Sequence, residues 1–129
     1  VKPWCTKTGG FVSLLGTSDA RCVSDRAMDA DKTAQRAWDA MIYQIIKYIG
    51  AMSTVLHGKV DGILLGGGMV YNKELVKQIS EACSFIAPVY AYPGEFELEA
   101  MNAGAARVLS GEETAREYTG VPRWNGFEV

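Results

Sequence analysis

The sequence predicts an α/β fold with a mainly parallel sheet covered by helices, and two observations support this. Three short apolar runs have the residues of β-strands, at 11–15, 60–65 and 88–92. Residues with helical periodicity lie between these runs, and strands joined by helical crossovers pair in parallel. Three strands make a small sheet, and the chain does not begin with Met. We therefore expect residues 1–129 to form a single partial domain of a longer protein.

The first predicted strand, Phe11–Leu15, stops at Gly16 and is followed by small polar residues. Asp19 and Arg21 lie two residues apart, and in an extended segment such residues share one face. Both side chains could then reach one polar ligand at the carboxyl end of the strand. A local Asp–Arg pair or an Asx turn is the alternative, which the spacing alone favours.

A long amphipathic helix is predicted between Asp31 and Gly58. Its apolar residues recur at spacings of three, four and seven, which place them on one helical face. They are Ala34, Trp38, Met41, Ile42, Ile45, Ile49, Met52 and Leu56. We expect Asp29 or Asp31 to cap the N-terminus and Gly58 to occupy the C′ position. The methionine and aromatic side chains of this stripe belong to the core rather than to a cofactor site.

The stretch from Val60 to Leu75 joins the second predicted strand to the triplet Gly66-Gly67-Gly68 and to a helix that begins near Asn72. It is not a P-loop, because no Gly-Lys pair follows the triplet at the required spacing. A dinucleotide fingerprint would need glycine at Tyr71. What remains is a strand, a glycine turn and a helix N-terminus, whose free N–H groups could face an anion or a nucleotide. The structural alternative is a tight turn that needs glycine for its backbone alone.

The third predicted strand, Pro88–Tyr92, is followed by a helix with an acidic start, because Glu95, Glu97 and Glu99 precede its alanine-rich part. Acidic residues in a first turn stabilise a helix through its dipole and need no functional reason. Three carboxylates at the end of a strand could instead hold Mg²⁺, directly or through water.

After the acidic helix, the sequence predicts one short polar helix and a tail that contains aromatic residues. We expect the acidic helix to end near Leu109 and a second, short helix to occupy 111–117. The tail at 119–129 contains Trp124 and Phe127, whose side chains must dock or stay exposed.

The composition excludes several classes of function. Thirteen basic and fifteen acidic residues give a net charge of −2, so there is no electrostatic reason to expect nucleic acid or a membrane surface as partner. No apolar run approaches the roughly 18 residues of a membrane span. Cys5, Cys22 and Cys83 match neither a zinc site nor a disulfide framework, which predicts a reducing, cytoplasmic compartment.

Three segments, in this order along the chain, carry a more specific signal. They are Gly16-Thr17-Ser18-Asp19-Ala20-Arg21, the stretch from Gly58 to Asn72, and the stretch from Ala87 to Ala100. Together they resemble the C-terminal part of butyrate kinases, in the acetate and butyrate kinase family. The resemblance extends from about Gly9 to about Tyr118. It implies a ribonuclease H-like fold of the actin-like ATPase superfamily, with the chain as its adenosine-binding C-terminal half-domain.

The resemblance also implies roles for individual residues. A first group would bind the nucleotide: Asp19, Ala20, Arg21, Gly67, Gly68, Met69 and Asn72. Glu97, or alternatively Glu95, falls near a glutamate that the family associates with Mg²⁺. Gly66 departs from the family pattern, which often has threonine there. No catalytic residue is implied within this chain.

The implied reaction is reversible phosphoryl transfer between ATP and butyrate, or a similar short or branched-chain acid, to give an acyl phosphate and ADP. ATP or ADP and Mg²⁺ are the expected cofactors, and we expect the chain alone to be inactive. The alternatives are a stand-alone nucleotide-binding or interaction module without catalysis, and a small flavodoxin-like domain whose glycines only make turns. The choice of acid and the oligomeric state, including a homo-oligomer, are left open.

Overall fold

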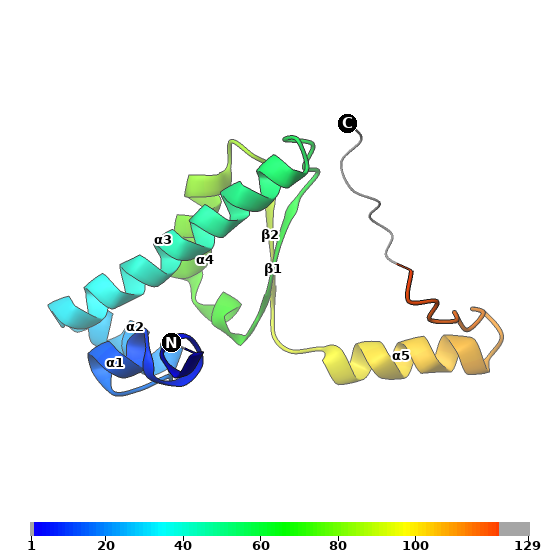
Figure 1. The fold of residues 1–129 in the computed structure, drawn as a ribbon, viewed down its shortest axis with the longest axis horizontal. Coiled ribbons are helices and arrows are strands. Elements are labelled where there is room, and N and C mark those ends of the chain that lie inside the picture. The colour runs from blue at the N-terminus through cyan, green and yellow to red at the C-terminus, as the bar shows by residue number, and fades with distance from the viewer. Residues whose placement is uncertain (1, 122–129) are drawn as a thin grey trace. The chain divides into compact units, whose positions relative to one another are not determined.

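The structure, a computed structural model, describes residues 2–121 and divides into two compact units, 2–95 and 96–121. Residues 1 and 122–129 lie outside the described part. The elements of the first unit are, in chain order, the π-helical turn η1 (Trp4–Thr8), α1 (Phe11–Leu15), α2 (Ala20–Met28), α3 (Lys32–Val55), β1 (Ile63–Gly67), the 3₁₀ helix η2 (Gly68–Tyr71), α4 (Lys73–Cys83) and β2 (Val89–Pro93) (Figure 1). The second unit contains α5 (Glu97–Leu109).

Strands β1 and β2 form a parallel two-stranded sheet, with α4 as the helical crossover between them. The register pairs Ile63 with Val89 and ends with Gly67 opposite Pro93. A parallel α/β arrangement is therefore confirmed, although both strands begin slightly later than predicted. The ribonuclease H-like fold stays a prediction.

The predicted strand at 11–15 is wrong, because these residues form helix α1. A run of five apolar residues is too short for its periodicity to distinguish a strand from a helix. Packing decides the outcome: the ring of Phe11 stacks on Trp38 of α3, with centroids 6.4 Å apart and an interplanar angle of 10°. Leu15, one helical turn later, packs against the same core. The preceding residues, expected to be irregular, also contain a helical turn, η1.

Helix α2 was not predicted from the sequence. Asp19, expected at the end of a strand, is the N-cap of this helix, and its carboxylate accepts a hydrogen bond of 2.8 Å from the N–H of Arg21. The local Asx-type alternative is therefore confirmed, and the extended segment is wrong. The helix is held by its apolar side, where Val23 is fully buried and Ala27 packs against the core.

Helix α3 confirms the predicted long helix, and its N-cap is Asp31. Oδ1 of Asp31 accepts hydrogen bonds from the N–H groups of Thr33 and Ala34, and Oδ2 accepts from the guanidinium of Arg26 at 2.7 Å. The bonds from Ala34 and Arg26 hold the pKa of Asp31 below its usual value. Arg26 also donates to the carbonyl oxygen of Leu15, so that this ion pair joins α1, α2 and α3.

The end of α3 is a Schellman motif, in which the C′ residue has a left-handed backbone. The N–H of His57 donates to the carbonyl of Thr54 at 3.0 Å, and the N–H of Gly58 donates to the carbonyl of Ser53 at 2.9 Å. His57, with a φ of 53°, therefore occupies the C′ position. The prediction of Gly58 at this position was wrong by one residue.

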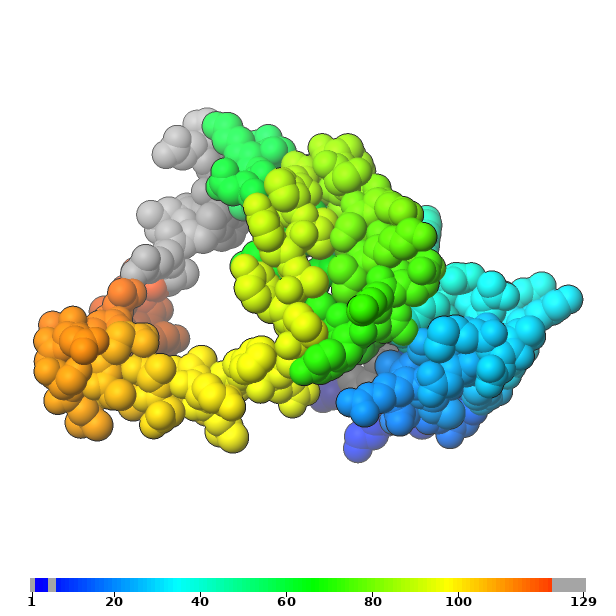
Figure 2. Space-filling view, turned by 180° about the vertical axis from the view of Figure 1, so that it is seen from behind, coloured from blue at the N-terminus to red at the C-terminus, as the bar shows by residue number. Residues whose placement is uncertain are grey.

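The core of the first unit lies between the helices and one face of the sheet. Its buried residues come from α2, α3 and α4: Val23, Trp38, Ile42, Leu75, Ile79 and Cys83. Ile63, Leu65 and Val89 pack against this cluster from the sheet. Figure 1 shows α3 and α4 on the same side of the strands, and in the reverse view of Figure 2 the lime-green surface of α4 is in front.

The other face of the sheet is not covered within the first unit. Leu64, Tyr90 and Tyr92 are 70%, 48% and 57% exposed. Their positions alternate with those of the core residues, because successive side chains of a strand point to opposite faces. The prediction of a sheet covered by helices thus holds for one face of this unit.

The second unit consists of α5 and the segment that follows it. Glu97 and Glu99 lie in the first turn of α5, as predicted, whereas Glu95 precedes the helix. The short helix predicted at 111–117 is wrong, because the chain turns at Gly111, with a φ of 79°, and then becomes irregular. Arg107 and Glu113 form an ion pair of 3.0 Å across this turn. The tail aromatics Trp124 and Phe127 lie outside the described residues.

Candidate functional site

A hollow of about 490 Å³ lies within the first unit, between the start of α2 and the segment that joins β1 to α4. The α2 side contributes Asp19, Ala20, Arg21, Ser24, Asp25 and Met28. The opposite side contributes Gly68, Met69, Tyr71 and Asn72, while Trp38 and Glu95 complete the lining. Two of the segments singled out in the sequence, about 50 residues apart, therefore form the two walls of one pocket.

The α2 wall is shaped by the turn that begins the helix. The hydroxyl of Thr17 accepts a hydrogen bond from the N–H of Asp19, whose carboxylate then caps the N–H of Arg21. These bonds start the helix at Ala20 and place Arg21 and Asp25, one turn later, along the pocket. The carboxylate of Asp19 therefore already has a partner within the protein, the N–H of Arg21.

The opposite wall depends on two adjacent glycines with different roles. Gly67 has a φ of 92° and a ψ of 177°, a backbone region that is essentially restricted to glycine. Gly68 has an ordinary φ, and a Cβ atom added there would meet no atom within 4 Å. Gly67 therefore makes the turn possible, and Gly68 leaves space beside it.

Asn72 ends this turn and begins α4. Its Oδ1 accepts a hydrogen bond of 2.9 Å from the N–H of Leu75, which confirms the helix start predicted near this residue. Between Gly68 and Asn72, Val70 is buried in the molecule, whereas Met69 is 38% exposed. The alternation leaves the thioether of Met69 available at the pocket, where a methionine can pack on an aromatic ring.

The charged groups give the pocket a negative character. Asp19, Asp25 and Glu95 contribute three carboxylates, and Arg21 contributes one guanidinium. Carboxylates accept hydrogen bonds from hydroxyl and amino groups, whereas they repel phosphate. The pocket thus combines carboxylates with the apolar side chains of Trp38 and Met69. This combination suits an uncharged, hydroxyl-bearing ring system such as a nucleoside.

Comparison with known proteins identifies the family. The sequence model of the Acetokinase family matches residues 1–119. The chain belongs to the acetokinase family. Butyrate kinase 2 of Clostridium acetobutylicum is 47% identical over 113 residues, which are 88% of this chain and 32% of that protein. This confirms the resemblance to butyrate kinases, and the acetokinase-family chain spans about a third of the length of this curated relative.

Most of the residues predicted to bind nucleotide meet at the pocket of this acetokinase-family chain. Asp19, Ala20, Arg21, Gly68, Met69 and Asn72 line it. Gly67 does not line it but sets the turn before Gly68. The sequence reasoning missed Ser24, Asp25, Met28, Trp38 and Tyr71. Asp25 and Met28 follow from α2: had the helix been recognised, the spacings of four and seven residues from Arg21 would have placed them on the same helical face.

The two predicted metal ligands lie in different units. Glu95 lines the pocket, and Glu97 is the first residue of α5 in the second unit. Within residues 2–121, no three carboxylate, cysteine or histidine side chains gather as a metal site would require.

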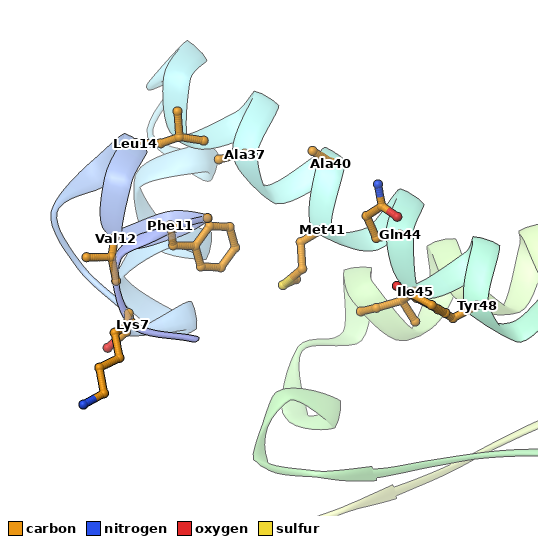
Figure 3. Close-up of a pocket in the computed structure, with 13 residues that line it drawn as sticks. Lys7, Phe11, Val12, Leu14, Ala37, Ala40, Met41, Gln44, Ile45 and Tyr48 are labelled. Carbon is orange, nitrogen blue, oxygen red and sulfur yellow. The ribbon is translucent and has the colours of Figure 1, made fainter. Parts of the chain in front are cut away.

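A larger hollow, of about 640 Å³, lies between α1 and α3 of the acetokinase-family chain. Figure 3 shows Phe11 from α1 facing Met41 of α3, with the amino group of Lys7 pointing away from the hollow. Its lining is almost entirely apolar and includes none of the residues that the sequence singled out for chemistry. The smaller pocket is therefore the candidate site.

No helix among the described residues is long and apolar enough to cross a membrane.

Proposed function

We propose that this chain is the nucleoside-binding portion of a carboxylate kinase. The kinase would transfer phosphate reversibly between ATP and butyrate, or a similar short or branched-chain acid, to give an acyl phosphate and ADP. Membership of the acetokinase family and the 47% identity to a butyrate kinase support the reaction class. The observation that carries the nucleoside role is the single pocket in which the Asp19–Arg21 and Gly68–Asn72 segments face each other.

The pocket residues have complementary roles in this proposal. The side chains of Met69 and Trp38 would pack against the base, and Gly68 would let the backbone approach it closely. The carboxylate of Asp25, which has no described protein partner, would accept hydrogen bonds from the ribose hydroxyls. The negative character of the pocket would keep the phosphates outside it.

Magnesium would accompany the nucleotide phosphates, with Glu97, or alternatively Glu95, as the proposed ligand. Among the described residues, no three carboxylate, cysteine or histidine side chains lie close enough together to hold a metal ion. A single carboxylate at the pocket suits contact through water better than a protein-built cage, since Mg²⁺ in kinases keeps several waters and binds the phosphates.

Titration of the chain with ADP, followed by amide chemical shifts, tests the nucleoside role. We expect perturbations at Asp19–Asp25 and Gly68–Asn72, because the two walls of the pocket come from these segments. Adenosine should perturb the same residues, whereas inorganic tripolyphosphate should leave them unchanged, since the pocket is negative. An ADP titration that shifts no amide in either wall would overturn the proposal.

The chain alone is expected to produce no butyryl phosphate from ATP and butyrate. Phosphoryl transfer requires cationic groups around the transferred phosphate, and Arg21 is the one cationic side chain of the pocket. The measurement is a hydroxamate assay, with a full-length butyrate kinase as positive control. Turnover above the no-protein background would show that this chain carries the catalytic machinery as well.

A further inference from the structure

We propose that Ser24 and Asn72 form a crossbar that fixes the distance between the two walls of the pocket. Both would be positioning residues, which act on the bound nucleoside through the walls and not by direct contact. The inference rests on the proposed nucleoside role of the pocket, and it assigns Asn72 a different task from the nucleotide ligand expected from the sequence.

The crossbar is a side-chain hydrogen bond between residues far apart in the chain. Nδ2 of Asn72 donates to Oγ of Ser24 at 2.7 Å, across a sequence separation of 48 residues. Ser24 is only 6% exposed, so water competes little for this bond. Among the described residues, no other hydrogen bond links α2 to the segment 68–83.

The amide of Asn72 is used at both ends. Oδ1 caps the N–H of Leu75 in α4, while Nδ2 reaches Ser24 in α2. Because the amide group is planar and rigid, the start of α4 and the second turn of α2 are held at one separation. The side-chain oxygen of Asn72 and one of its two N–H groups thus already form hydrogen bonds within the protein. This argues against a primary role of Asn72 as a nucleotide ligand.

Besides the crossbar, the two walls are joined through α3 and the buried core. Helices α2 and α4 each pack mainly against α3, and Val23 of α2 lies in the same buried cluster as Leu75 and Ile79 of α4. At the pocket itself, no other hydrogen bond among the described residues joins the two walls, so their pocket-facing ends could move apart if the crossbar were absent. The pocket would then widen. A wider pocket should bind an adenine ring more weakly and should accept a larger, substituted base.

The test compares Ser24→Ala, Asn72→Ser and the double variant by titration with ADP and with N⁶-benzyl-ADP. Serine at position 72 keeps a capping oxygen but is too short to reach residue 24. Each single variant should weaken ADP binding by about two- to tenfold, the loss expected for one hydrogen bond. The double variant should bind ADP no more weakly than the weaker single variant, and affinity for N⁶-benzyl-ADP relative to ADP should rise in all three.

Ser80→Ala is the matched control. Ser80 lies in α4 and donates to the carbonyl of Val76 at 2.7 Å, but it does not line the pocket. It should leave both affinities and their ratio unchanged. A Ser24→Ala chain with wild-type affinities, or with both affinities reduced by the same factor, would overturn the crossbar. If Ser24→Ala does not fold, Asn72→Ser gives the same readout.

Failure of the proposed function can be told apart from failure of the crossbar. If the wild-type chain binds no ADP, the nucleoside role fails. The crossbar is then judged by a double-mutant cycle of unfolding in urea with the same variants. A double variant as stable as the less stable single one supports the bond between the walls, whereas fully additive losses refute it.

Discussion

Replacing Gly68 by leucine is expected to weaken ADP binding by at least about tenfold, or 1.4 kcal/mol. Gly68 lines the pocket, its backbone has no glycine-only conformation, and a Cβ atom there meets nothing within 4 Å. The new side chain can therefore be accommodated by the fold while it takes space that the nucleoside would occupy. Isothermal titration with ADP, and urea unfolding as a check of stability, measure the two effects separately.

The neighbouring Gly66 provides the control for this substitution. It also has no atom within 4 Å of an added Cβ, but it lies opposite Tyr92 in the sheet and does not line the pocket. Gly66→Leu should bind ADP within about twofold of the wild type, a difference below 0.5 kcal/mol. Equal losses in the two variants would show that the effect of Gly68→Leu does not come from filling the pocket.

Truncation of Ile79 to alanine is expected to lower the free energy of unfolding by about 2–5 kcal/mol. Ile79 is 1% exposed and lies in the middle of α4, within the cluster that joins this helix to α2 and α3. Loss of its side chain leaves a cavity among residues already fixed by their helices. Against a total stability of about 5–15 kcal/mol for a typical domain, the change should be large in urea unfolding followed by circular dichroism.

Leu64→Ala serves as the comparison for Ile79→Ala. Leu64 is also a branched aliphatic residue, but it is 70% exposed on the sheet face that the first unit leaves uncovered. Its truncation should change the stability by no more than about 0.5 kcal/mol, as is usual for surface positions. A similar loss in both variants would mean that Leu64 is buried in solution.

The sequence predicted those parts of the fold in which several local signals coincide. In α3, a long apolar stripe follows the capping residue Asp31. In the segment from β1 to α4, an apolar run is followed by glycines and then by the capping residue Asn72. The run at Phe11–Leu15 had no such support. Its five residues suit a strand or a helix equally, and the stacking of Phe11 on Trp38 selects the helix.

The site was predictable only in part, for a different reason. Local motifs and the family resemblance indicated Asp19, Ala20, Arg21, Gly67, Gly68, Met69 and Asn72, and all of these except Gly67 line one pocket. Ser24 and Trp38 have ordinary helical positions in the sequence, and their relation to the pocket arises from tertiary packing. Whether Glu97 holds a metal stays a prediction, because this residue belongs to the other unit.

The two glycines of the turn are open to mutation to different degrees. At position 67 the backbone excludes other residues whatever the protein binds, since its φ of 92° is needed for the chain to turn. At position 68 the φ is ordinary and an added Cβ meets no atom within 4 Å, so an occupant of the pocket is what we expect to oppose a side chain there. A related protein that no longer binds a nucleotide could therefore vary at position 68 but would keep glycine at position 67. The residues at these two positions would then indicate whether the pocket still binds a ligand.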